Sequence, residues 1–261
     1  MRIGLSSATY YGVMETENAV EDIRRFGVPC CEVFLETFSE YDTDFGRLVR
    51  SRLGDIEPVA VHARSQHFEA DILGKSARQR TDGYYWFNRA LDASAEIGVK
   101  LYVYHGPQAL RGERRPISQW ACDLRLAIEL AARRGIELCW ETVSWCALNA
   151  PDRVTEAISV CPDLCFTLDV KQAIETGYDP IDYVRAMGPR LRHVHVLDYD
   201  CVGRHALPGC GRTDFSALAR ELREIGYAGD VILEPYSWMA RDENALRDSL
   251  DYLRCAFGGE S

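Results

Sequence analysis

Six short apolar runs in this chain of 261 residues each end in a histidine or a carboxylate. Each run has the length and the apolar continuity of a β-strand that is buried on both faces. A closed barrel of parallel strands brings the carboxyl ends of its strands together at one mouth. The six polar residues that would meet there are His62, His105, Glu141, Asp169, His195 and Glu234.

The apolar runs alternate with longer amphipathic segments from one end of the chain to the other. We expect strands at residues 2–6, 30–35, 58–62, 100–105, 136–141, 164–169, 191–197 and 230–234. We expect helices at residues 16–26, 42–53, 77–97, 117–134, 151–160, 214–225 and 243–257, with a broken helical stretch that restarts at Pro180 and ends at Met187. Eight such units without a linker predict a single (β/α)8 TIM barrel domain over residues 1–261.

Charge and composition exclude several classes of protein. A net charge of −10 argues against a nucleic-acid partner, because long-range attraction to a phosphate backbone needs positive charge. No apolar run reaches the roughly 18 residues that a membrane helix needs. The N-terminal residues lack the pattern of a signal peptide, so we expect a cytoplasmic location. Ten cysteines without a Cys-x-x-Cys pair are expected to be reduced thiols rather than zinc ligands.

Three of the six mouth residues are carboxylates, and they predict a cation. Glu141, Asp169 and Glu234 would repel one another at one mouth unless a positive ion neutralised them. Together with one imidazole they suit one divalent metal ion, namely Mn²⁺, Mg²⁺, Co²⁺ or Zn²⁺. A metal that holds adjacent hydroxyl and carbonyl oxygens acidifies the carbon-bound proton between them, and glutamates can then move that proton. This is the chemistry of a sugar isomerase or epimerase.

Several motifs resemble the xylose-isomerase-like barrel superfamily, which includes sugar epimerases, inosose and dehydroshikimate dehydratases, and apurinic-site endonucleases. They are Leu168-Asp169, the run His193 to Asp198, the loop Leu207 to Gly211 followed by Asp214-Phe215, and Gly226 to Gly229 before Glu234. The resemblance implies carbohydrate metabolism and one metal held by Glu141, Asp169, His195 and Glu234. It also implies that Glu141 and Glu234 carry the proton as acid and base, and it allows a homo-oligomer.

The endonuclease branch of this superfamily binds additional zinc ions, and the chain matches its pattern only in part. His62, His105 and His205 stand where that branch has further ligands. Gln172 stands where it has a histidine, and Gly203 where it has an aspartate. With the negative net charge, these departures count against DNA repair. His62 and His105 then have two remaining roles, which are contact with substrate or a second metal shared with Glu141.

Other residues near the predicted mouth are candidates for binding a small carbohydrate. An aromatic residue such as Trp145 can stack on a sugar face. Arg204 and His205 precede a glycine-rich loop and can contact a phosphate or hydroxyl group. The full predicted substrate-binding set is His62, His105, Trp145, Lys171, Gln172, Arg204 and His205.

Three other functions fit the same residues. The enediolate formed by proton removal can expel a β-hydroxyl, which would make the protein a dehydratase or lyase. Lys171, just past the sixth strand, could form the Schiff base of an aldolase. A barrel that binds a sugar without turnover is the alternative that involves no catalysis.

Overall fold

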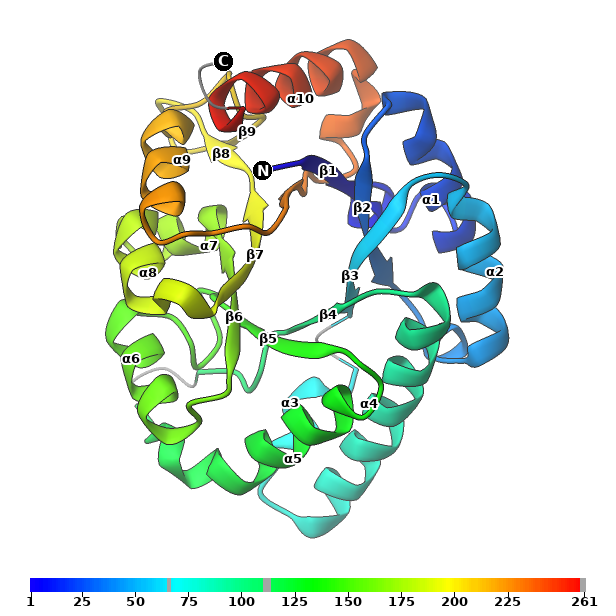
Figure 1. Cartoon of the computed structure of the whole chain (residues 1–261), viewed down its shortest axis with the longest axis vertical. Helices are drawn as coiled ribbons and strands as arrows, with labels where there is room; N and C mark the ends of the chain where they lie inside the picture. The colour runs from blue at the N-terminus through cyan, green and yellow to red at the C-terminus, as the bar shows by residue number, and fades with distance from the viewer. Residues whose placement is uncertain (65–66, 110–113, 259–261) are drawn as a thin grey trace.

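Eight parallel strands close into a barrel in the order β1-β10-β7-β6-β5-β4-β3-β2 (Figure 1). The structure is a computed structural model that describes residues 1–64, 67–109 and 114–258. Its barrel strands are β1 Ile3–Ser6, β2 Cys30–Leu35, β3 Glu57–Ala63, β4 Leu101–Tyr104, β5 Glu137–Glu141, β6 Cys165–Asp169, β7 Leu191–Val196 and β10 Val231–Leu233. All eight predicted strands are present, so the predicted (β/α)8 barrel is confirmed.

The helices form an outer ring around the strands (Figure 1). They are α1 Thr16–Ile23, α2 Thr43–Leu53, α3 Glu69–Ile72, α4 Ala77–Ile97, α5 Ala121–Ala132, α6 Pro151–Val160, α7 Val170–Glu175, α8 Pro180–Met187, α9 Phe215–Glu224 and α10 Glu243–Phe257. The bounds of α4, α6 and α10 are those predicted. Local signals explain the agreement for α4, because Ser76 and Gln79 form a capping box and Gly98 ends the helix at φ +93°.

The structure differs from the predictions in short segments. The last turn expected in residues 16–26 is a 3-10 turn, Arg24–Phe26, and residues 117–120 form another 3-10 turn before α5. The connection after β7 contains a two-stranded antiparallel sheet, β8 Asp198–Tyr199 and β9 His205–Ala206, that the sequence pattern does not predict. Strands of two residues are too short to produce a readable alternation of apolar and polar residues.

A deeper layer lies inside the barrel beneath the polar residues of the mouth, and it is apolar except where Thr167 and His193 contribute to it. Alternate residues of a strand share a face, so the residue two positions before each mouth residue points into the barrel one layer deeper. Cys30, Ala60, Val103 and Ile232 lie in this deeper layer, are fully buried and pack together. A Cβ atom at Gly4 would lie 2.5 Å from Ile232 Cδ1, so this strand approaches the layer closely enough to require glycine.

Two further features of the described residues are the apolar length of the helices and the state of the cysteines. Across residues 1–64, 67–109 and 114–258, no helix is both long enough and apolar enough to cross a lipid bilayer. All ten cysteines are free thiols, and six of them are buried.

Candidate metal centre

The structure brings four of the predicted mouth residues together at one point. Glu141 and Asp169 are the last residues of β5 and β6, His195 lies in β7, and Glu234 follows β10 directly. The register of the parallel sheet places Asp169 beside His195. One donor atom from each of the four residues lies within 4.8 Å of all the others. This spacing is compatible with one metal ion bound by three carboxylates and one imidazole.

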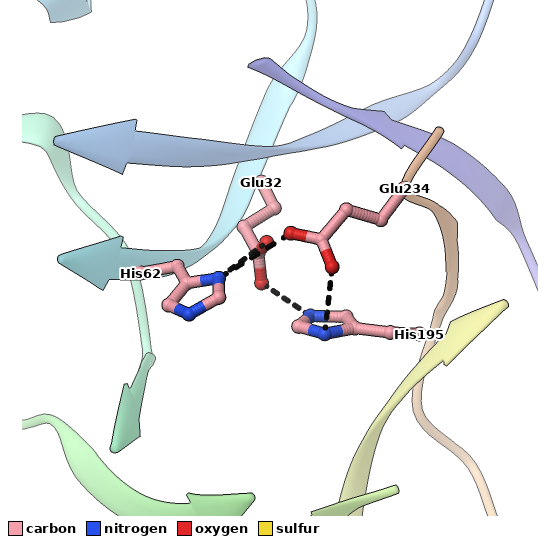
Figure 2. A group of neighbouring side chains, drawn as sticks. All are labelled: Glu32, His62, His195 and Glu234. Atoms are coloured by element: carbon pink, nitrogen blue, oxygen red, sulfur yellow. Dashed lines mark hydrogen bonds and ion pairs between the residues drawn. The ribbon is translucent and has the colours of Figure 1, made fainter. Parts of the chain in front are cut away.

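Both ring nitrogens of His195 face carboxylate oxygens. Its Nε2 lies 2.7 Å from Glu32 Oε2, and its Nδ1 lies 3.5 Å from Glu234 Oε2 (Figure 2). The same Nδ1 lies 2.8 Å from Glu141 Oε1. A neutral imidazole has one N–H and an ionised carboxylate only accepts, so one ring nitrogen of neutral His195 must face a carboxylate with its lone pair; when the hydrogen is on Nε2 and is donated to Glu32, that nitrogen is Nδ1. The lone pair on Nδ1 then faces two further carboxylates. A positive ion or a second proton must occupy this position.

His62 and His105 form a pair of histidines in which a ring-nitrogen lone pair also faces another acceptor. Their Nε2 atoms are 2.6 Å apart, and Nδ1 of His105 lies 2.8 Å from Glu69 Oε2. Nδ1 of His62 is buried without a hydrogen-bond partner among the described residues, and its nearest carboxylate oxygen is Glu234 Oε1 at 3.4 Å. Because Glu69 holds the hydrogen of His105 on Nδ1, either neutral form of His62 leaves a lone pair facing another acceptor.

His62 and His105 also lie close to the first group of donors. Nε2 of His105 is 3.3 Å from Glu141 Oε2, and Nε2 of His62 is 3.9 Å from the same oxygen. These three residues form a second set of donor atoms within 4.8 Å of one another. Glu141 therefore presents one oxygen to each set, which is compatible with a second metal as one of the two roles expected for His62 and His105.

Burial and the neighbouring charges shift the pKa values of several residues at the site. Burial raises the pKa of Asp169 to about 6, with the Lys171 ammonium opposing the shift and the carboxylates of Glu141 and Glu234 adding to it. Burial would also raise the pKa of Glu141, but the hydrogen bond from His195 and the charge of His105 lower it to about 2. Burial lowers the pKa of His195, yet the nearby Glu32 and Glu234 carboxylates raise it well above its ordinary value. The raised pKa favours the protonated form of His195, which brings positive charge among these carboxylates.

Two fully buried glutamates take part in the site although the sequence prediction gives them no role. Glu32, inside β2, accepts hydrogen bonds from the Nε2 atoms of His193 and His195. Glu69, in α3, accepts from the Tyr102 hydroxyl and from both Nδ1 and the backbone N–H of His105. The signal for Glu32 is a single charge inside an apolar strand, which is costly unless it is paired. No local pattern marks Glu69.

Lys171 and Gln172 lie beside Asp169 at the start of α7. Lys171 is only 7% exposed, and its Nζ lies 3.7 Å from Asp169 Oδ2 and 3.5 Å from the Tyr236 hydroxyl. Asp169 Oδ1 accepts the backbone N–H of Gln172, and the Gln172 side-chain oxygen accepts from the hydroxyl of Ser144 at 2.7 Å. Both predicted substrate-binding residues are therefore next to the candidate metal ligands.

The remaining predicted substrate-binding residues differ in their placement. Trp145 is 39% exposed and its ring stacks on that of His105 at 6.1 Å between ring centres. His205, in β9, lies against the ring of Tyr236 and accepts or donates a hydrogen bond at 3.0 Å with Tyr199. The side chain of Arg204 is 80% exposed and is bound to Asp200. Trp145 and His205 are thus linked by contacts to the site, whereas Arg204 faces solvent.

A comparison with known protein families matches most of the chain. The family model described as "Xylose isomerase-like TIM barrel" matches residues 20–255. The protein "Uncharacterized protein Rv0498" of Mycobacterium tuberculosis (strain ATCC 25618 / H37Rv) is 33% identical over 285 residues, which covers 97% of both chains. The "3-dehydro-D-guloside 4-epimerase" of Escherichia coli (strain K12) is 26% identical over 195 residues, which covers 67% of this chain and 72% of the relative.

Solved structures share the same fold. A D-psicose 3-epimerase solved in the presence of D-fructose superposes with a TM-score of 0.79, and it covers 99% of this chain and 100% of its own. Its sequence is 19% identical to this chain, so the likeness concerns the fold.

Proposed function

This chain belongs to the xylose isomerase-like TIM barrel family, and on that premise we propose that it is a divalent-metal-dependent epimerase or isomerase. Its substrate would be a sugar, sugar phosphate or cyclitol. Relatives with a stated activity are sugar epimerases, which supports this general class of reaction. The finer assignment depends on the residues at the mouth of the barrel.

The observation that carries the proposal is that His195 Nδ1, a nitrogen able to bind a cation, lies among the carboxylates of Glu141 and Glu234. The donor set of three carboxylates and one imidazole fits Mn²⁺, Mg²⁺, Co²⁺ or Zn²⁺. Glu141, Asp169, His195 and Glu234 would hold this ion. When bound there, the ion supplies Lewis acidity that polarises a substrate carbonyl.

Glu141 and Glu234 approach His195 Nδ1 from β5 and β10, so they can act on a substrate from two sides. One carboxylate removes the proton from the carbon next to the carbonyl, and the electron pair of that C–H bond moves toward the carbonyl oxygen. The other glutamate, as its acid, returns a proton to the opposite face for an epimer. The Glu234 side chain is 13% exposed and that of Glu141 3%, so Glu234 exchanges its proton with water more readily.

The contacts around this centre support substrate-binding roles for the residues next to it. They are His62, His105, Trp145, Lys171, Gln172 and His205. Arg204 would have to leave its ion pair with Asp200 to join them. The described geometry favours Lys171 as a neighbour of the Asp169 carboxylate rather than as the nucleophile of an aldolase, because a Schiff-base lysine must be neutral and its pKa is raised here.

The test combines metal content with proton exchange. Elemental mass spectrometry on wild type, Asp169→Ala and His195→Ala should find about one divalent ion per chain in wild type and none in either variant. Two ions per chain would favour a second metal at His62 and His105 over their role in contacting substrate. No ion, even after loading with Mn²⁺, Co²⁺ or Zn²⁺, would overturn the proposal.

The metal-loaded protein is then incubated in D₂O with a panel of ketoses, aldoses and inososes and followed by proton NMR. Loss of one C–H signal beside a carbonyl, abolished in Glu234→Gln, is the expected result. A new product that absorbs in the ultraviolet would indicate elimination of water and hence a dehydratase. Sugar binding without exchange by the loaded protein would indicate a barrel without turnover.

A further inference from the structure

We propose that Glu32 is a positioning residue that makes Nδ1, and not Nε2, the metal-binding atom of His195. The inference rests on the proposed function, because it concerns how a metal ligand is oriented. Glu32 is not among the predicted metal ligands. Solvent does not reach its carboxylate, because the residue is fully buried inside β2. A carboxylate in that position needs a role that offsets the cost of burying its charge.

Both carboxylate oxygens of Glu32 accept hydrogen bonds. Oε2 accepts from Nε2 of His195 at 2.7 Å and from Nε2 of His193 at 2.9 Å. Oε1 accepts from the Ser6 hydroxyl at 3.1 Å. The carboxylate is therefore held from β1 and from two positions of β7, in a fixed orientation within the barrel. Figure 2 shows the Glu32 carboxylate directed at the ring of His195 and joined to it by a hydrogen bond.

This orientation decides the chemistry of the imidazole. A ring that donates its Nε2 hydrogen to Glu32 presents the Nδ1 lone pair toward Glu141 and Glu234. The negative charge of Glu32 also increases the electron density of the ring, which strengthens the bond from Nδ1 to a cation. A carboxylate behind a ligating histidine commonly has both effects.

The geometry favours this role over that of a metal ligand for Glu32 itself. Glu32 does lie within 4.8 Å of donor atoms of His62, His195 and Glu234. However, its Oε2 is already engaged by two imidazole groups, and its Oε1 lies 3.6 Å from His62 Nδ1, too far for a hydrogen bond. Binding a cation through Oε2 would break the contact that holds His195.

The experiment identifies the ring nitrogen that binds the metal. Wild type with ¹⁵N-labelled histidine is loaded with ¹¹³Cd²⁺, and the ¹¹³Cd–¹⁵N coupling is assigned to Nδ1 or Nε2 of His195 by NMR. We expect coupling to Nδ1. In Glu32→Leu we expect the coupling to move to Nε2 or to vanish, with the Cd²⁺ dissociation constant about 10- to 100-fold higher.

Glu32→Gln removes the negative charge of Glu32 but keeps a hydrogen-bond acceptor in the same place. The amide oxygen can accept from both imidazoles while the amide nitrogen donates to the Ser6 hydroxyl. We therefore expect coupling to Nδ1 to persist, with Cd²⁺ binding weaker by roughly tenfold. This variant keeps the test decisive if Glu32→Leu does not fold, because an unchanged affinity in Glu32→Gln would overturn the inference.

Glu40→Gln is the matched control. Glu40 is also a buried glutamate that accepts hydrogen bonds, from Thr16 and from the backbone of Glu36, but it makes no contact with the centre. Its substitution should leave the Cd²⁺ affinity and the Nδ1 coupling unchanged. Coupling to Nε2 in wild type, or equal affinities in wild type and Glu32→Leu, would overturn the role of Glu32 alone. Failure of wild type to bind Cd²⁺, Mn²⁺ or Zn²⁺ would overturn the proposed function.

Discussion

Glu69 accepts hydrogen bonds from both the ring Nδ1 and the backbone N–H of His105, at 2.8 and 2.9 Å. Its other oxygen accepts from the Tyr102 hydroxyl. The connection between β3 and α4 is thereby tied to the end of β4 through one buried side chain. The same bonds turn the Nε2 of His105 toward His62 and Glu141.

Removal of Glu69 should therefore destabilise the fold. Glu69→Ala leaves the His105 N–H and the Tyr102 hydroxyl buried without partners, and each such group costs about 1–3 kcal/mol. We expect the free energy of unfolding of the metal-free protein to fall by about 3 kcal/mol, as measured by urea denaturation. Glu69→Gln retains an accepting oxygen and should cost about 1 kcal/mol.

The control for this prediction is an exposed glutamate in an ion pair. Glu129 pairs with Arg133 one turn later on the surface of α5, with both side chains more than half exposed. Glu129→Ala should change the unfolding free energy by less than about 0.5 kcal/mol. An equally small effect of Glu69→Ala would contradict the anchoring role.

Proton release on metal binding should depend on pH. The pKa of Asp169 is raised to about 6 by burial, so below pH 6 its carboxyl group is protonated and a cation must displace that proton. Burial lowers the pKa of His195, but Glu32 and Glu234 outweigh it, so its Nδ1 also carries a proton near neutral pH. We expect these two ligands to release about two protons per cation at pH 5 and one at pH 7.5.

Calorimetric titration with Mn²⁺ in buffers of different ionisation enthalpy measures this number directly. The metal dissociation constant should accordingly rise more steeply with falling pH below about pH 6 than above it, because a second proton then competes. The same proton release at pH 5 and pH 7.5 would show that Asp169 is already ionised throughout this range.

Lys171 should oppose metal binding while supporting the substrate. Its ammonium lies 3.7 Å from Asp169 Oδ2, so it repels any cation held by that carboxylate. Lys171→Met should lower the metal dissociation constant by up to about tenfold, and raise KM because a buried donor at the site is lost. Lys171→Arg keeps the charge and should stay near wild type in metal affinity. Loss of metal binding in Lys171→Met would show that the ammonium holds Asp169 in place.

The barrel and its ring of polar residues can be read from the sequence because both depend on local patterns. Apolar runs of strand length predict the strands, and their end residues predict the mouth once the strands are parallel. The helix at 77–97 has the predicted bounds because its caps, Ser76 and Gly98, lie beside it in sequence.

The hydrogen-bond partners of the two buried glutamates could not be predicted from the sequence. Glu32 is visible as one charge in the apolar run of β2, but its partners His193 and His195 come 161 and 163 residues later. Glu69 lies in a helix of four residues, and only the folding of that connection onto β4 brings it to His105. Tertiary packing brings these hydrogen-bond partners together, so no regular spacing in the sequence predicts them.

The predicted substrate-binding residues separate into two groups that kinetics can distinguish. Trp145 is partly exposed and stacks against His105, and His205 packs on Tyr236, whose hydroxyl meets Lys171. Arg204 is bound to Asp200 and faces solvent. We therefore expect Trp145→Ala and His205→Ala to raise KM for the sugar found by the exchange screen by roughly three- to tenfold, the worth of one aromatic contact.

Arg204→Ala supplies the contrast, because exposed ion pairs contribute little energy. Its KM should remain within about twofold of wild type, and kcat should be unchanged in all three variants, since none of these side chains contacts the Glu141 or Glu234 carboxylates. Initial rates over a range of sugar concentrations measure both constants. A larger increase in KM for Arg204→Ala than for Trp145→Ala would mean that the β8–β9 hairpin turns Arg204 onto the bound substrate, with Asp200 left behind.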